Sequence, residues 1–168
     1  MTEQEIISGV LKEFEGLAKH PRPSHHEKEV SDYIVARLAE LGVKARQDEM
    51  YNIIADVPAT PGCENVPLTI LQGHMDMVCV AKPGVAFDPQ KDPIKLVREG
   101  NILRADGTSL GADDGIAVAI SLYLIQQKIQ HGPLRLIFTV DEETNMTGAL
   151  SLSADHVKDA KYVINCDS

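Results

Sequence analysis

Residues 115–144 read GIAVAISLYLIQQKIQHGPLRLIFTVDEET and contain the two kinds of element that decide the fold. Gly115 to Lys128 is an apolar segment of helical length. Leu134 to Val140 is a strand in which apolar residues run on without regular alternation. Strands of this kind are typical of a parallel sheet that is covered on both faces. The stretch therefore predicts an α/β fold.

The same alternation of helices and strands extends over the rest of the chain. A capping box at Thr2 and Glu5 predicts the start of a first amphipathic helix. A second box, Ser24 with Glu27, predicts another helix that Gly42 would end in the left-handed conformation. The remaining predicted elements are strands at Val43 to Gln47, Asn52 to Val57, Pro67 to Gln72 and Lys161 to Cys166, a hairpin at Lys95 to Ala105, and a short helix at Thr147 to Leu152. The prediction is a mostly parallel sheet with helices on both faces.

Composition limits the classes of function. The 168 residues are 43% apolar, which suits a single globular domain over residues 1–168. The net charge is −9 and no dense cluster of Lys and Arg occurs, so we expect neither a nucleic-acid partner nor a membrane partner. The acidic amino terminus lacks the basic and apolar regions of a secretory signal. A cytoplasmic location is expected.

Acidic residues and one histidine gather in four loops that leave a predicted strand or enter a helix. Chemistry in open α/β sheets collects beyond the carboxyl ends of strands, so we expect these loops to meet. Each group alone has a simpler explanation, such as a helix cap or a solvated turn. Together, crowded carboxylates would repel one another and raise their own pKa values, and a cation removes that repulsion. The residues are His74 and Asp76, Asp113 and Asp114, Glu142 and Glu143, and Asp167.

The residue types indicate the kind of metal and the chemistry. Several carboxylates with one imidazole suit zinc, cobalt or manganese better than magnesium or copper. A bridging carboxylate would hold two ions about 3.5–4 Å apart, as in hydrolytic pairs. Asp76 lies two residues after His74, so its carboxylate is expected to accept from the far imidazole nitrogen and orient the ring. Of the adjacent Glu142 and Glu143, one is expected to bind metal and the other to act as general base.

Five sequence blocks resemble, in order and spacing, the M20-type zinc metallopeptidases and, within them, the Xaa-His dipeptidase branch. The blocks are Pro23–Glu27, Leu71–Val78, Gly111–Ile116, Asp141–Thr144 and Asn165–Ser168. The resemblance covers essentially the whole chain. It implies the zinc-exopeptidase (phosphorylase/hydrolase-like) fold and the hydrolysis of small dipeptides of the Xaa-His type with a free amino end.

The resemblance also implies a role for each site residue. His74, Asp113 and Asp167 would hold one zinc ion, and Asp113 together with Glu143 would begin the second zinc site. Asp113 would bridge the ions, and the peptide bond that follows it would be cis. Glu142 would be the catalytic general base. Asp76, also counted among the catalytic residues, would be the carboxylate that orients His74.

The sequence departs from the family pattern at its end. The family takes a further histidine for the second metal from far downstream, and an inserted lid domain supplies substrate contacts and the dimer interface. Because this sequence ends at Ser168, we expect the lid and the carboxy-terminal part of the catalytic domain of a homodimeric enzyme to be absent.

Three alternatives remain open at this stage. The chain could be part of an N-acyl amino acid deacylase of the same family, or it could be a metal-binding fragment without catalytic activity. The segment Gly107 to Gly111 also matches the G-x-S-x-G pattern of a serine-hydrolase elbow. That motif requires a strand directly before the serine and a helix directly after it, so the structure distinguishes this alternative from the others.

Overall fold

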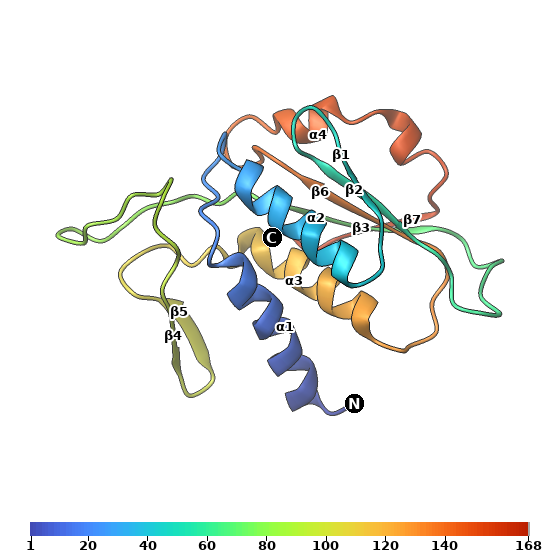
Figure 1. Ribbon diagram of the computed structural model, residues 1–168, viewed down its shortest axis with the longest axis horizontal. Helices are drawn as coiled ribbons and strands as arrows, with labels where there is room; N and C mark the ends of the chain where they lie inside the picture. The colour runs from blue at the N-terminus through green and yellow to red at the C-terminus, as the bar shows by residue number, and fades with distance from the viewer. Residues whose placement is uncertain (168) are drawn as a thin grey trace.

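A five-stranded sheet forms the centre of the computed structural model, which describes residues 1–167 (Figure 1). The strands are ordered β1-β2-β6-β3-β7 across the sheet. Their bounds are β1 Ala45–Gln47, β2 Ile53–Val57, β3 Thr69–His74, β6 Leu134–Thr139 and β7 Tyr162–Asn165. β3 pairs in parallel with β6 and β7, whereas β2 is antiparallel to β1 and β6. All of these strands except β2 therefore run in one direction, which confirms the predicted mostly parallel sheet.

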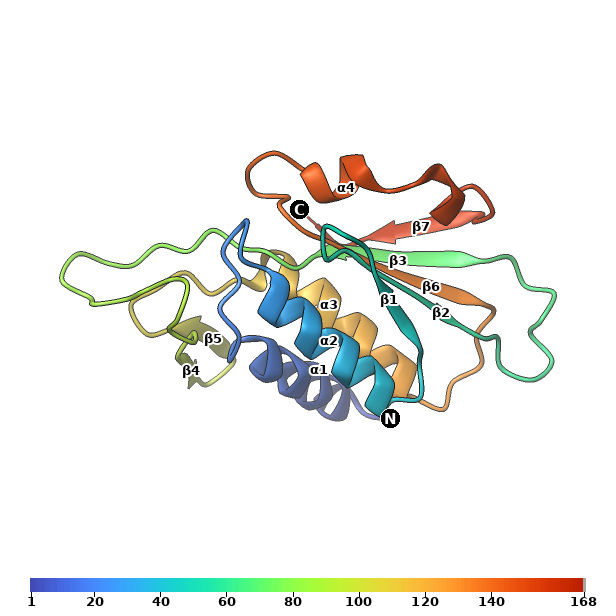
Figure 2. The same ribbon diagram turned by 45° about the horizontal axis from the view of Figure 1, so that its top comes forward.

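Three long helices cover one face of the sheet, and shorter helical turns lie on the other (Figure 2). The long helices are α1 Glu3–Leu17, α2 Lys28–Glu40 and α3 Ala112–Gln126, and the opposite face carries α4 Thr147–Ser151 and the 3-10 turn Ala154–His156. Helix α3 packs against both α1 and β3, which explains why it is apolar on more than one side. Helices on both faces were predicted, and this is confirmed.

The core lies between the layer of long helices and the sheet. Its largest buried side chains include Phe14, Leu17, Ile34, Leu38, Ile53, Leu122, Leu136 and Phe138. Fully burying one such side chain contributes about 1.5–3 kcal/mol. Because these residues come from α1, α2, α3, β2 and β6, a single core fixes the position of β6 and of its neighbour β3.

One of the two predicted capping boxes is confirmed and the other is wrong. The Thr2 hydroxyl accepts from the backbone N of Glu5 at 3.3 Å, and the Glu5 carboxylate accepts from the backbone N of Thr2 at 2.7 Å. Glu27 occupies the N-cap position of α2 but makes no side-chain capping hydrogen bond. The Ser24 hydroxyl donates instead to the buried carboxylate of Asp76 at 2.7 Å. A hydrogen bond to a carboxylate is stronger than one to an exposed helix amide, so the tertiary contact overrides the local signal.

The remaining predicted turns and strands agree closely with the structure. Gly42 ends the second helix with φ +77°. The predicted hairpin forms a separate two-stranded sheet of β4 Leu96–Glu99 and β5 Ile102–Ala105. β1 begins at Ala45, two residues later than the predicted start at Val43. Among residues 1–167, no helix combines the length and the apolar character needed to cross a membrane.

Candidate metal centre

The carboxyl ends of β3, β6 and β7 lie side by side at one edge of the sheet because these strands are parallel neighbours. His74 is the last residue of β3, and Asp167 follows β7. The amino end of α3 joins the same edge, since the carboxylate of Asp114 accepts from the backbone N of His74 at 3.2 Å. The four acid-bearing loops therefore meet in space. Ser168, the final residue of the fifth sequence block, lies outside the described residues.

Two overlapping groups of residues bring possible metal-ligand atoms within 4.8 Å of one another. One group is His74, Glu142 and Asp167, and the other is His74, Asp113 and Glu143. Together they contain every residue that the sequence analysis proposed as a metal ligand, and also the proposed general base. The grouping differs from the proposed one, which placed Asp113 and Asp167 on the same ion.

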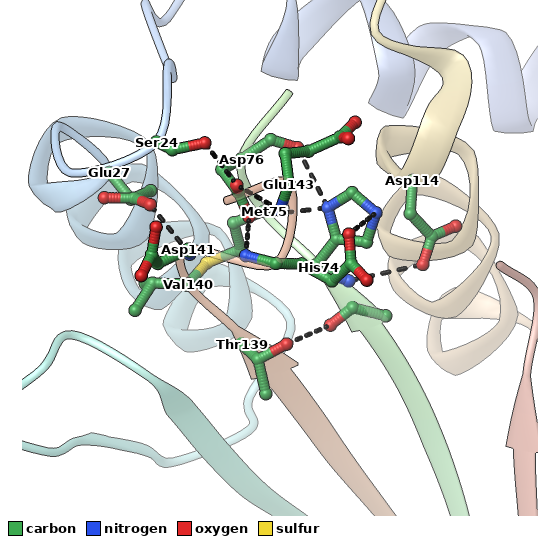
Figure 3. A network of polar contacts seen from close by, with 12 residues as sticks. Ser24, Glu27, His74, Met75, Asp76, Asp114, Thr139, Val140, Asp141 and Glu143 are labelled. Carbon is green, nitrogen blue, oxygen red and sulfur yellow. Dashed lines mark hydrogen bonds and ion pairs between the residues drawn. The ribbon is translucent and has the colours of Figure 1, made fainter. Parts of the chain in front are cut away.

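The imidazole of His74 is held in a fixed orientation (Figure 3). Its Nε2 atom lies 3.2 Å from Oδ1 of Asp113 and 3.8 Å from Oε2 of Glu142. Its Nδ1 atom lies 3.0 Å from the main-chain oxygen of Asp76 and 3.4 Å from the Asp76 carboxylate. Asp76 therefore engages the ring mainly through its carbonyl, and Nε2 is the nitrogen that faces the other carboxylates.

The carboxylate of Asp76 connects two of the loops. The side chain is fully buried at 0% exposure. Its Oδ1 accepts from the backbone N of Glu142 at 3.0 Å, and its Oδ2 accepts from the backbone N of Glu143 at 3.1 Å. Burial alone would raise the pKa of Asp76, but hydrogen bonds from His74 and these backbone groups hold it at about 2. An ionised Asp76 thus fixes the position of the Glu142–Glu143 turn as well as that of the histidine.

The electrostatics of the site reflect crowded negative charge. Burial opposes protonation of His74, yet the hydrogen bond and charge of Asp76 raise its pKa to about 9. Burial raises the pKa of Asp114 to about 6, with the charge of His74 acting in the opposite direction. Burial and the charge of Asp167 also raise the pKa of Glu142. A divalent cation placed among these groups would relieve the repulsion.

The first turn of α3 presents its two acids in different environments. The peptide bond between Asp113 and Asp114 is cis, as the family resemblance implied. Both residues have non-helical backbone angles, so regular helix geometry begins at Gly115, where the sequence predicted it. The Asp113 side chain is 55% exposed, whereas Asp114 is 1% exposed. Asp113 therefore reaches the site from the solvent side, and Asp114 lies beneath it.

Arg22 and Glu27, which were not predicted as site residues, hold the loops that carry the candidate ligands. Arg22 is buried and donates to the main-chain oxygens of Met75 and Gly111. Glu27, which had been assigned to a capping box, accepts from the backbone N of Asp141 at 2.9 Å. The available signal was the position of Arg22 directly before the first family block.

The serine-hydrolase alternative fails on geometry. Strand β5 ends at Ala105, so no strand leads directly into Ser109. The Ser109 hydroxyl donates to the main-chain oxygen of Val78 at 2.6 Å and accepts from the backbone N of Val80 at 3.0 Å. Ser109 therefore ties down a loop and is not presented at a sharp turn between a strand and a helix.

Comparison with known proteins identifies relatives of the chain. The profile described as peptidase family M20/M25/M40 matches residues 70–167. The chain is 38% identical over 156 residues to the cytosol non-specific dipeptidase of Escherichia coli K12, a match that covers 92% of this chain and 32% of that protein. The crystal structure of aminoacylhistidine dipeptidase from Vibrio alginolyticus matches with a TM-score of 0.90 at 38% identity, over 96% of this chain and 33% of that one.

A more distant structural match adds information about the fold alone. A dinuclear metal-binding peptidase of the M20 family from Bacillus subtilis matches with a TM-score of 0.60 at 17% identity, over 97% of this chain and 43% of that one. The chain spans about a third of the length of the two dipeptidases.

Proposed function

Because the chain belongs to peptidase family M20/M25/M40, we propose that residues 1–168 supply the amino-terminal, metal-binding segment of the catalytic domain of a dipeptidase. The observation that carries the proposal is the meeting of four loops, which places candidate ligand atoms within 4.8 Å of one another. Capping or loop packing of each acid alone does not account for their gathering around one buried histidine.

The donor set suits zinc. It offers one imidazole nitrogen, Nε2 of His74, which can bind a metal ion when it is unprotonated, and several carboxylates that face this nitrogen. Asp113 is the proposed bridge between two ions, with Asp167 and Glu143 completing the ligands that this chain provides. Bound zinc would lower the pKa of a water molecule and polarise the scissile carbonyl. Cobalt and manganese accept similar ligands and are expected to substitute.

Glu142 is the proposed general base. Its side chain is partly exposed, and burial together with the charge of Asp167 raises its pKa, which suits a carboxylate that must take up and return a proton. It would take the proton from the attacking water and deliver it to the leaving amine. Asp76 holds the backbone of Glu142 and the imidazole of His74, so it orients both the base and a ligand.

The proposed substrates are dipeptides with a free amino end, of the Xaa-His type. The name of the Vibrio alginolyticus relative supports this substrate class, and the name of the Escherichia coli relative supports dipeptides in general and a cytoplasmic location. A homodimer is proposed for the complete enzyme.

A chimeric protein tests this function. Residues 1–167 replace the matching segment of the Escherichia coli dipeptidase, and release of free histidine from alanyl-histidine is measured with and without zinc. We expect zinc-dependent hydrolysis of the dipeptide and no hydrolysis of N-acetyl-histidine. Preference for the N-acetyl compound would replace the dipeptidase by a deacylase, and a folded, zinc-loaded chimera that cleaves neither compound would refute the proposal.

A further inference from the structure

Arg22 is a buried cation directly behind the candidate metal centre. Its side chain lies among main-chain oxygens, and the residue is 2% exposed. Nη1 donates to the carbonyl of Met75 at 2.8 Å and to that of Asp76 at 3.3 Å, and Nη2 donates to the carbonyl of Gly111 at 2.5 Å. One guanidinium therefore joins the loop that carries His74 to the loop that carries Asp113.

Packing around the guanidinium is close. A Cβ atom added at Gly111 would lie 2.4 Å from Nη2 of Arg22, and one added at Gly115 would lie 2.6 Å from the same atom. Contacts below 3.0 Å are essentially never seen for real Cβ atoms, so the backbone on both sides of Asp113 and Asp114 leaves room only for glycine while Arg22 stays in place. Arg22 and the start of α3 are fitted to each other.

Burying the guanidinium of Arg22 costs free energy of folding. Among residues 1–167 the Nε of Arg22 has no hydrogen-bond partner, and the negative charges of Asp76 and Asp114 offset only part of the cost of burying the guanidinium. A buried charge and a buried donor without an acceptor both disfavour folding. Burial lowers the pKa of Arg22 to about 10, so the side chain remains charged at neutral pH. The hydrogen bonds of Arg22 to the loop after β3 and to the start of α3 give this buried cation a positional role.

Two further residues of the same segment reach the site. The Ser24 hydroxyl donates to Oδ2 of Asp76 at 2.7 Å. The carboxylate of Glu27 accepts from the backbone N of Asp141 at 2.9 Å, directly before the Glu142–Glu143 turn (Figure 3). The backbone of the segment also pairs with the loop after β3, since the backbone N of Met77 donates to the oxygen of Arg22 at 3.1 Å.

We propose that residues 22–27 form a brace that sets the spacing of the three ligand loops, with Arg22 as its main positioning residue. The brace contacts the loop after β3 through Arg22 and Ser24, the start of α3 through Arg22, and the loop after β6 through Glu27. None of these groups is a ligand, so the brace acts through the residues it holds. This inference rests on the proposed metal-binding function.

Cobalt(II) titration followed by visible absorption tests the brace, because both the affinity and the intensity of the absorption bands depend on how the ligands are arranged. Arg22→Lys keeps the positive charge, but a lysine has a single ammonium nitrogen and cannot donate to both loops at once as the two terminal nitrogens of the guanidinium do. Arg22→Met removes the charge as well, and Ser24→Ala removes a single hydrogen bond to Asp76. Removal of groups that hold metal ligands typically weakens metal binding by about 10–100-fold.

Matched controls separate positioning from general stability. Arg37→Lys alters an arginine that pairs with the buried Glu13 at 2.7 Å, away from the ligands. Ser31→Ala removes a buried hydroxyl that donates to the main-chain oxygen of Tyr51. Urea unfolding is measured for every variant, and cobalt binding is compared only among folded chains.

We expect Arg22→Met and Arg22→Lys to weaken cobalt binding by at least about tenfold and to change the absorption spectrum, with a smaller effect in the same direction for Ser24→Ala. The two controls are expected to bind cobalt as the unsubstituted chain does. Unchanged cobalt affinity and an unchanged spectrum in the folded Arg22 and Ser24 variants would contradict the positioning role of residues 22–27, but not the proposed metal site. An equal loss in the controls would also contradict that role, and an unsubstituted chain that binds no cobalt would contradict both proposals.

Discussion

Asp76 contacts His74, Glu142, Glu143 and Ser24 at once. Its main-chain oxygen faces Nδ1 of His74, and its carboxylate accepts from the backbone of Glu142 and Glu143. The carboxylate also accepts from the hydroxyl of Ser24. The short His-x-Asp spacing predicted that the Asp76 carboxylate would accept from the imidazole, but the main-chain oxygen is nearer to Nδ1, at 3.0 Å against 3.4 Å for the carboxylate. The contacts with Glu142 and Glu143 span more than sixty residues of sequence, so no local pattern could predict them.

The raised pKa of His74 predicts how the stability of the metal-free chain depends on pH. Its pKa is raised from the ordinary 6.5 to about 9, because the effect of Asp76 outweighs burial. A raised value means that the protonated ring stabilises the fold, fully below pH 6.5, and that this stabilisation is lost as the pH rises through about 9. Urea unfolding in EDTA should show the free energy of unfolding falling by about 3 kcal/mol over this range.

Asp76→Asn is the control for that pH dependence. Without the carboxylate charge, the pKa of His74 should return toward its ordinary value, and the decline between pH 6.5 and about 9 should flatten. A decline of the same size in Asp76→Asn would show that another group titrates.

Glu142→Gln separates metal binding from catalysis. The amide keeps the size of the side chain but cannot accept and return a proton, so hydrolysis by the chimeric dipeptidase should fall by about 10²–10⁴-fold. Zinc content should stay close to that of the unsubstituted chimera, because His74, Asp113 and Asp167 are unchanged. Metal content is measured by atomic absorption beside the rate. Turnover that survives the substitution would remove Glu142 from the role of base.

Strand β6 and its neighbours could be predicted from the sequence, because apolar residues occur along the whole length of each strand and indicate a strand buried on both faces. The predicted strand Leu134 to Val140 differs from the observed one by a single residue at its end. The N-terminus of α2 was not predictable in the same way. The box at Ser24 and Glu27 satisfied the local rule, but both side chains are used by residues that lie far along the chain. Local rules cannot weigh a helix cap against a partner that only the tertiary fold brings close.

Leu136→Ala tests the central position of β6. Leu136 is 0% exposed and lies in the main core, so the truncation should lower the free energy of unfolding by about 2–5 kcal/mol. Leu150→Ala is the matched control, because that leucine is 81% exposed and its loss should change stability by no more than about 0.5 kcal/mol. Urea unfolding measures both. Equal effects of the two truncations would contradict the placement of the core.

The molecule as a whole combines a stable apolar layer with an acidic edge. The parallel strands β6, β3 and β7 bring their carboxyl ends to that edge, and α3 adds its first turn. The alternation of helices with apolar strands predicted this arrangement. It could not predict the order of the strands, because β3 lies between β6 and β7, which both follow it in the sequence.

Metal binding should stabilise the whole fold, since the ligands come from loops that are distant in sequence. A ligand present at a hundred times its dissociation constant adds about 2.7 kcal/mol to the free energy of unfolding. Thermal unfolding with zinc should therefore occur at a higher temperature than unfolding with EDTA. A zinc-independent midpoint would contradict this expectation.

Calorimetric titration of the chain with zinc tests the central claim most directly. We expect saturable binding of at least one ion per chain, with His74→Ala abolishing it, because His74 belongs to both groups of candidate ligands. His156→Ala, which alters a histidine outside both groups, should bind zinc unchanged. Absence of saturable binding, or equal binding by His74→Ala, would contradict the assignment of this edge of the sheet as a metal centre.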